Sequence, residues 1–294
     1  MPIIFTSPGP MLVQLGSFFI RWYSLSIALA ILLGLYLSPK LACQRRVNPV
    51  IVSDILPVMV VVSILFARIY YVIFQWDYYC DHWSEILAVW KGGIAIHGAL
   101  IGSTLTVAVF SYRKHHSFLT LTDILVPSIA MGQAIGRWGN FFNSEAFGLP
   151  TSSFLKIAIS YNSRQSLFIN QQFFHPTFLY ESCWDLSICL LLLVLFHRIS
   201  QGKIYLSDGT LTCFYLISYG LGRFWIEGIR SDPLCLLGNA PLCENGLRMA
   251  QVMSLTMIAL GTFCLLKMVK SYTTCDGLHK SPIKFYYNSQ PGSN

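Results

Sequence analysis

The sequence predicts an all-α polytopic membrane protein with about seven transmembrane helices and a small external head segment. Hydrophobic residues make up 54% of the 294 residues and charged residues only 11%, whereas roughly a quarter of the residues in a soluble domain are charged. A helix that crosses a bilayer needs about 20 mostly apolar residues. Runs of this kind recur along the chain, at about 17–37, 54–74, 93–111, 122–140, 177–197, 208–228 and 248–268.

The net charge of +7 fits two kinds of partner, a nucleic acid or a membrane. Nucleic-acid binding requires a basic patch on a folded surface. The Lys and Arg residues of this chain are instead scattered between apolar runs, which is the pattern that membrane topology produces. We therefore expect membrane lipid, and no nucleic acid, among the partners.

The basic residues also predict the orientation of the spans, because cytoplasmic loops carry an excess of Lys and Arg. If the N-terminus lies outside, the cytoplasmic segments hold Lys40, Arg45, Arg46, Arg113, Lys114, Arg198, Lys203, Lys267, Lys270, Lys280 and Lys284. The outer segments then hold only Lys91, Lys156, Arg164, Arg230 and Arg248. This bias predicts an N-terminus outside and a C-terminus in the cytoplasm.

We expect a single transmembrane domain over residues 1–270, whose polar and aromatic segment at about 141–176 forms the external head. Residues 271–294 are polar, contain Gly, Pro and Ser, and are predicted to be a disordered cytoplasmic tail. Three runs open on an aspartate that can cap a helix start, although a plain loop role fits each of them equally well: Asp54, Asp123 and Asp208.

Ionisable side chains inside apolar runs are costly in a membrane and are therefore candidates for function. In the predicted orientation most of the polar side chains in or beside the spans gather toward the outer leaflet: His97, Arg137, Asn140, Glu181, Asp185, Arg223 and Glu227. Arg137 and Asn140 are spaced to share a helix face. Tyr219, Arg223 and Glu227 recur at every fourth residue and form one polar stripe.

Two arginines at this depth indicate an anion-binding site. The guanidinium fork matches a phosphate group and keeps its charge in a poorly hydrated place. A phospholipid head group is the most abundant anion there, so we expect Arg137 and Arg223 to bind one. In the alternative interpretation, Arg223 and Glu227 only neutralise each other.

Glycines surround His97, at Gly92, Gly93 and Gly98. Glycine lets two backbones approach closely and also lets a helix start irregularly. The depth of His97 in the membrane matches that of the arginines, which favours a functional role over a structural one.

The nine cysteines include no paired C-x-x-C spacing for zinc or redox chemistry. We therefore expect no metal and no cofactor. Cys235 and Cys243 fall in the predicted outer loop after Arg230, on a side of the membrane that can be oxidising. We predict that they form a disulfide that ties down this loop and takes no part in chemistry.

The long motif GRWGNFFNSEAFG lies at 136–148. It fits the signature G-R-x-G-N-F-x-N-x-E-x-x-G at every fixed position, and it resembles the prolipoprotein diacylglyceryl transferase family, whose other motifs occur in order over nearly the whole chain. Four others are RWY at 21–23, GGIAIHGALIG at 92–102, HPTFLYE at 175–181 and YGLGR at 219–223. Ala99 and Ala250 depart from family glycines by one methyl group each. Phe178 replaces a glutamine, which puts a polar role at that position in doubt.

The resemblance implies an enzyme of the bacterial cytoplasmic (inner) membrane that needs no cofactor. Its donor would be phosphatidylglycerol and its acceptor the lipobox cysteine of a preprolipoprotein, with a thioether and glycerol phosphate as products. The catalytic residues would be His97, Arg137, Arg223, Tyr23, Asn140, Glu145, Tyr219 and Glu227. Those binding phosphatidylglycerol would be Arg137, Arg223, Asn140 and Gly148.

The residues fit this chemistry. The nucleophile is the substrate's own thiol, whose pKa of about 8.5 calls for a base or a positive field. Arg137 and Arg223 can stabilise the negative charge on the departing phosphate ester. Asn140 and Tyr23 can add neutral hydrogen bonds, and we expect Glu145 and Glu227 to orient the arginines.

The sequence also bears on rival functions. An intramembrane protease would carry an H-E-x-x-H, G-x-G-D or G-x-S-G motif, and the sequence has none of them. An S-acyltransferase would carry D-H-H-C, which the Asp81-His82-Trp83 segment does not match. A non-enzymatic transporter or channel is the alternative from a different class, and it predicts solute flux without lipid transfer.

Overall fold

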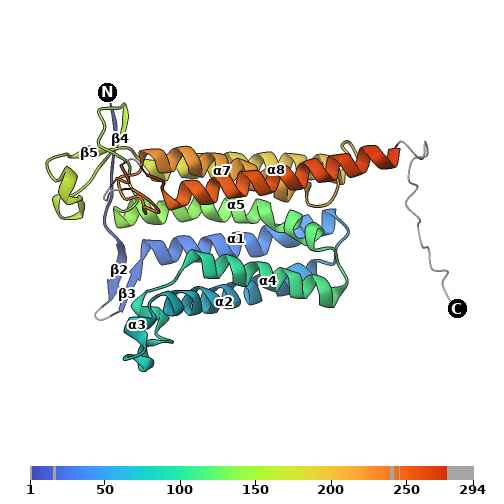
Figure 1. Cartoon of the computed structure of the whole chain (residues 1–294), viewed down its shortest axis with the longest axis horizontal. Coiled ribbons are helices and arrows are strands. Elements are labelled where there is room, and N and C mark those ends of the chain that lie inside the picture. Colours follow the sequence, from blue (N-terminus) through green and yellow to red (C-terminus); the bar gives the residue numbers. More distant parts are fainter. Residues whose placement is uncertain (1, 16–17, 239–241, 245, 277–294) are drawn as a thin grey trace.

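The computed structural model describes residues 2–15, 18–238, 242–244 and 246–276, and its described part is dominated by long helices that run along one common axis (Figure 1). Each predicted apolar run overlaps one of these helices. They are α1 (Trp22–Gln44), α2 (Pro49–Phe74), α4 (Ile96–Lys114), α5 (Phe118–Asn143), α6 (Thr177–Ser200), α7 (Thr210–Ile229) and α8 (Met249–Asp276).

Five helices of the described chain are long and apolar enough to cross a membrane, namely α1, α2, α5, α6 and α8. The other two long helices are more polar. α4 ends in Arg113 and Lys114, and α7 carries Arg223 and Glu227. The chain is therefore a multi-pass helical membrane protein, whereas a total of seven spans stays a prediction.

The helices pack as neighbouring pairs, most extensively α2 with α4, α7 with α8, and α5 with both α1 and α6. Glycines permit the closest of these approaches. A Cβ on Gly98 would lie 2.2 Å from the carbonyl oxygen of Phe66, and one on Gly102 would lie 2.9 Å from that of Val62. The main apolar core fills one half of the bundle and includes Val52, Ile55, Leu121, Ile124, Leu192, Phe196 and Leu211.

The opposite end of the bundle carries the strands (Figure 1). The strands β1 (Ile3–Thr6), β4 (Leu155–Ala158) and β5 (Phe173–Phe174) form a sheet in the order β1-β4-β5, with β1 parallel and β5 antiparallel to β4. A small second core lies beside this sheet and comprises Phe141, Phe147, Ile157, Ile159, Phe174 and Phe178. The predicted head at about 141–176 thus contains two of the three strands, and the N-terminal segment supplies the third.

Strands β2 (Met11–Leu15) and β3 (Phe18–Arg21) form an antiparallel hairpin that leads into α1. The first predicted run, at about 17–37, therefore began too early, because residues 18–21 pair with 11–15 instead of starting the helix. Short helical turns complete the described chain: α3 (Trp76–Tyr79), η1 (Trp83–Glu85), η2 (Val89–Lys91), η3 (Tyr161–Ser163) and η4 (Ser166–Phe168).

The capping role predicted for the three aspartates is wrong for their own helices. α2 begins at Pro49, where Asn48 accepts from the Val50 amide. α5 begins at Phe118, so Asp123 lies more than a turn inside it. The Asp123 carboxylate instead accepts from the backbone amides of residues 209 and 212, at 2.8 Å each, and so caps the start of α7.

Asp208 lies just before α7, where its carboxylate accepts a hydrogen bond from Thr120 and lies 3.5 Å from Arg45. At the other end of the chain, α8 continues to Asp276. The first six residues of the predicted disordered tail are therefore helical, and residues 277–294 lie outside the described residues.

Candidate active site

A buried glutamate joins the two predicted anion-binding arginines. Arg137 lies near the end of α5, Glu181 near the start of α6 and Arg223 near the end of α7. Glu181 Oε1 accepts from Arg223 Nη1 at 2.7 Å, and its other oxygen pairs with Arg137 Nε. Only 6% of the Glu181 side chain is exposed. Three helices are thus tied together at the head end of the bundle.

The network continues along α7. Arg223 Nη2 lies 2.6 Å from Glu227 Oε2, and Arg230 Nε lies 3.9 Å from the same oxygen. Arg230 also forms two hydrogen bonds with Asp232, at 3.0 and 2.9 Å. The pairing of Arg223 with Glu227 is therefore real, but it belongs to a larger network that includes Arg137.

Arg137 keeps donors available for a ligand. It uses Nε for Glu181, and within the described part of the chain no protein acceptor binds its two Nη groups. Arg223, in contrast, commits both of its Nη groups to carboxylates. An anion that enters this site can therefore bind Arg137 directly without breaking an ion pair, because that guanidinium still has free N–H groups.

A small pocket lies beside these groups, between α5, α6 and α7. Its lining residues are Arg137, Glu181, Trp184, Asp185, Tyr219, Gly222, Arg223 and Ile226. The indole of Trp184 reaches across Gly222, where a Cβ would lie 2.1 Å from the indole nitrogen. Asp185 is 3% exposed, and its Oδ2 has no hydrogen-bond partner among the described residues.

Two tyrosines of the predicted site approach the arginines from different helices. Tyr219 lies one turn before Arg223 on α7 and stacks on Tyr215 with ring centroids 5.8 Å apart. Tyr23 lies in the first turn of α1, and its ring fills the space over Gly139, where a Cβ would come within 2.3 Å of the ring. Gly139 thereby admits Tyr23 to the turn of α5 that carries Arg137.

The end of α5 holds Asn140 against Glu145. Asn140 Nδ2 donates to Glu145 Oε1 at 3.0 Å, and Asn143 Nδ2 donates to the same oxygen at 3.2 Å. The chain reverses here because Ser144 and Ala146 both have positive φ angles, of 52° and 57°. Glu145 is exposed and pairs with no arginine in the described structure. The expectation that it orients an arginine is therefore wrong, whereas Glu227 does contact Arg223.

Gly148, predicted to bind the lipid, is buried and tightly packed. Its amide donates to the His175 carbonyl at 2.9 Å, and it forms an isolated β-bridge with Arg230. A Cβ here would lie 2.7 Å from His175 Cβ and 3.0 Å from the Ile229 carbonyl oxygen. Burial lowers the pKa of His175, which favours the neutral ring at pH 7. The geometry gives Gly148 a packing role that brings the head close to the end of α7.

His97 lies apart from the arginine network, in the first turn of α4. Its ring stacks on Tyr70 of α2 with centroids 5.7 Å apart. Among the described residues it has no hydrogen bond to Glu145, Arg137 or Arg223. In a structural role, His97 would instead hold Glu145 or a tyrosine by hydrogen bonds, and the structure shows it stacked on a tyrosine. A base role requires the substrate to bridge from His97 to the arginines.

The sequence-based site missed Glu181, which stood among the ionisable span residues but was given no role. Its signal was an acid in an apolar run within HPTFLYE. Phe178 of the same motif is 4% exposed and packs against Phe5, Trp138 and Phe141. Phe178 therefore has a packing role, and position 178 supplies no polar group to the site.

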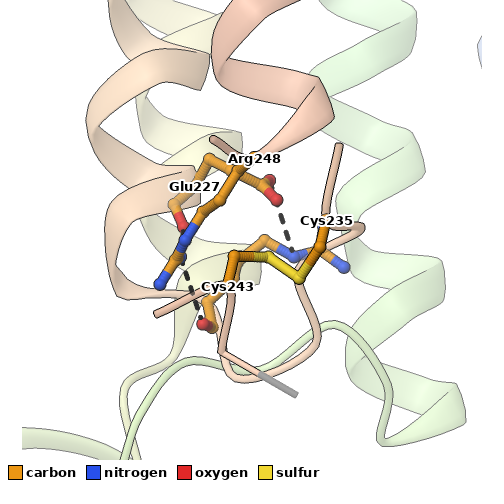
Figure 2. Close-up of a disulfide and its surroundings, with 5 residues drawn as sticks. Glu227, Cys235, Cys243 and Arg248 are labelled. Carbon is orange, nitrogen blue, oxygen red and sulfur yellow. Dashed lines mark hydrogen bonds and ion pairs between the residues drawn. A yellow bond between two sulfur atoms is a disulfide. The ribbon is translucent and has the colours of Figure 1, made fainter. Parts of the chain in front are cut away.

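The loop after α7 closes the head end, and Cys235 and Cys243 form the predicted disulfide there (Figure 2). Cys235 also pairs with Arg248 in an isolated β-bridge. Arg248 in turn donates from Nη1 to the backbone carbonyl of Glu227. The disulfide therefore secures the loop whose arginine holds the end of α7.

Comparisons with known proteins show the family of this chain. Residues 10–267 match the family model described as prolipoprotein diacylglyceryl transferase. Proteins called phosphatidylglycerol–prolipoprotein diacylglyceryl transferase are similar over most of the chain. The protein of Parasynechococcus marenigrum (strain WH8102) is 52% identical over 88% of this chain and 93% of its own length. That of Nostoc sp. (strain PCC 7120) is 52% identical over 89% of each.

These likenesses and the fold define a class, the multi-pass helical membrane proteins with a polar site at one end. Within that class, the chain belongs to the prolipoprotein diacylglyceryl transferase family.

Proposed function

We propose that this chain transfers the diacylglyceryl group of phosphatidylglycerol to the lipobox cysteine of preprolipoproteins in the bacterial cytoplasmic membrane. The names of its relatives supply the donor and the class of acceptor. The observation that carries the proposal is the arginine pair held on Glu181, with the Nη donors of Arg137 left free beside a small pocket between α5, α6 and α7. A guanidinium with free N–H groups suits the single phosphate group of an apolar lipid.

In the proposed reaction, the cysteine sulfur attacks the carbon of the diacylglyceryl group that is bonded to a phosphate oxygen. A C–S bond forms and the C–O bond breaks, so that glycerol phosphate leaves with one more negative charge. The thiol proton passes to a base. Arg137 binds the phosphate through its free N–H groups, where the low dielectric strengthens the interaction. Glu181, Arg223 and Glu227 fix the orientation of Arg137.

His97 is proposed as the base, in the first turn of α4. Tyr23, Tyr219 and Asn140 supply neutral hydrogen bonds to the lipid head group, and Glu145 keeps the Asn140 amide in place. Gly148 contributes by packing, because it lets the head approach the end of α7.

A transfer assay tests the proposal directly. The full chain in proteoliposomes of phosphatidylglycerol should increase the mass of a lipobox peptide by one diacylglyceryl group. A peptide with serine in place of the cysteine is the matched control and should stay unmodified. Folded protein that leaves the cysteine peptide unmodified would refute the proposed function.

The proposed topology is seven spans with the N-terminus outside and the C-terminus cytoplasmic, and with residues 1–270 as one catalytic domain. The bias of basic residues supports it, because Arg45, Arg113, Lys114 and Arg198 all lie at the ends of helices away from the head.

In a cysteine-free background, Ile4→Cys should therefore react with an impermeant maleimide added to intact cells. Phe285→Cys should react only after lysis. The reverse pattern would overturn the orientation.

The Cys235–Cys243 disulfide is expected to stabilise the fold without acting in the reaction. The double Cys→Ser variant should unfold at a lower temperature, by an amount that reflects about 2 kcal/mol for so short a loop. Its transfer rate should stay within about twofold of the unmodified chain at a temperature where both are folded. Loss of transfer in a double variant that is still folded would contradict a purely structural role for the disulfide.

A further inference from the structure

Arg68 of α2 is buried and binds the backbone of the loop that precedes α4. It is 4% exposed. Its Nε donates to the carbonyl of Ile86 at 2.8 Å, and its Nη2 donates to that of Glu85 at 2.6 Å. Its Nη1 donates to the carbonyls of Gly92 and Gly93, at 2.6 and 2.8 Å. One guanidinium thus gathers four carbonyls from both ends of the loop.

Arg68 has no carboxylate partner among the residues that the structure describes. Only aromatic rings flank it, with the centroids of Tyr71 and Tyr79 at 5.8 and 5.2 Å. A buried cation is costly unless polar groups replace its water. Carbonyl dipoles do so here, and they can do so only while the loop keeps this shape.

The loop is built to meet Arg68. Gly92 and Gly93 have φ angles of 89° and 74°, which L-residues with a side chain rarely adopt. A Cβ on Gly93 would lie 2.5 Å from Tyr71 and 2.7 Å from Arg68 Nη1. Both glycines therefore serve to turn their carbonyls onto the guanidinium and to let the loop lie against α2.

The residues that follow the loop fix the position of His97 against α2. The Ala95 amide donates to the Ala67 carbonyl at 3.1 Å. The His97 ring then stacks on Tyr70, and Gly98 packs directly on the Phe66 carbonyl. All three of these contacts are made with the turns of α2 that carry Arg68.

We infer that Arg68 is a positioning residue for diacylglyceryl transfer, which holds the 85–93 loop and thereby fixes His97 at the start of α4. This inference rests on the proposed function of His97 for its effect on activity. Its effect on the loop does not depend on that function, and the two can be measured separately.

Arg68→Lys tests the effect on the loop. An ammonium is a point donor and cannot reach the carbonyls that Arg68 binds at different edges of its planar guanidinium. In the full chain, hydrogen exchange of the amides in 85–95 should become at least severalfold faster, while exchange in the α6–α7 segment stays unchanged. Unchanged exchange in the loop would overturn the inference, whatever happens to activity.

The effect on activity is tested with His97→Gln. Arg68→Lys alone should lower transfer roughly 10- to 100-fold, as a small displacement of a reacting group does. Added to His97→Gln, it should cause little further loss, because its effect acts through His97. Losses that multiply would show that Arg68 acts elsewhere. If His97→Gln retains full transfer, the base role fails, and the exchange experiment still decides the role of Arg68 in the loop.

Two further variants complete the design. Gly93→Ala should reproduce the faster exchange and the loss of transfer, since its methyl group meets Arg68 and Tyr71; it also replaces Arg68→Lys if that variant does not fold. Arg45→Lys is the matched control, because Arg45 pairs with Asp208 at the opposite end of the bundle. It should leave both loop exchange and transfer unchanged. An equal effect of Arg45→Lys would identify a general loss of stability and refute the specific role.

Discussion

Replacing Arg137 or Arg223 by lysine should lower the rate of diacylglyceryl transfer about 100-fold, which corresponds to roughly 3 kcal/mol of lost transition-state stabilisation. Lysine keeps the positive charge but loses the planar pair of donors. Arg137→Lys removes the free N–H groups proposed to bind the phosphate. Arg223→Lys breaks the bridge between Glu181 and Glu227 that holds Arg137 in place.

The two variants should differ in their affinity for glycerol phosphate. Product inhibition measures this affinity, and it should weaken more for Arg137→Lys, because both Nη groups of Arg223 already face carboxylates whereas those of Arg137 do not. Arg198→Lys is the control, since Arg198 is exposed at the far end of α6, and it should keep full activity. Near-normal turnover of either arginine variant would remove that residue from the proposed phosphate site.

Local sequence patterns predicted the long helices because the apolar character of each helix depends on its own residues alone. Apolar runs of sufficient length locate a helix wherever it packs. The strands were missed for the opposite reason, because their pairing depends on residues that are distant in the sequence. β1 pairs with β4 across some 150 residues, and residues 18–21 are apolar enough to extend the first helical run. Only their partner strand, at 11–15, distinguishes them.

The same distinction separates the parts of the site. Spacing along α7 predicted the shared face of Tyr219, Arg223 and Glu227, which is a local property. The role of Glu181 depends on how α5, α6 and α7 pack, so that one carboxylate meets two arginines. Asp123 was assigned to the start of its own helix but caps α7 instead. Capping residues identify a helix start, but the sequence does not tell which helix they serve.

His97→Gln should lose transfer at neutral pH by about 100-fold or more, the usual contribution of a general base. Glutamine still forms hydrogen bonds but cannot take the thiol proton. Its activity should therefore recover in part as the pH rises toward about 8.5, where the substrate thiol ionises on its own. The separation of His97 from the arginines makes this dependence specific, because the arginines can stabilise the phosphate whether or not His97 takes the proton.

The measurement is the pH profile of transfer for His97→Gln and for the unmodified chain, with the same lipobox peptide. His197→Gln serves as the control, because His197 is exposed in the last turn of α6 at the other end of the bundle, and its profile should match that of the unmodified chain. A His97→Gln variant that keeps near-native transfer at pH 7 would exclude the base role. The stacking of His97 on Tyr70 would then be its whole contribution, and the arginine cluster alone would have to favour the thiolate.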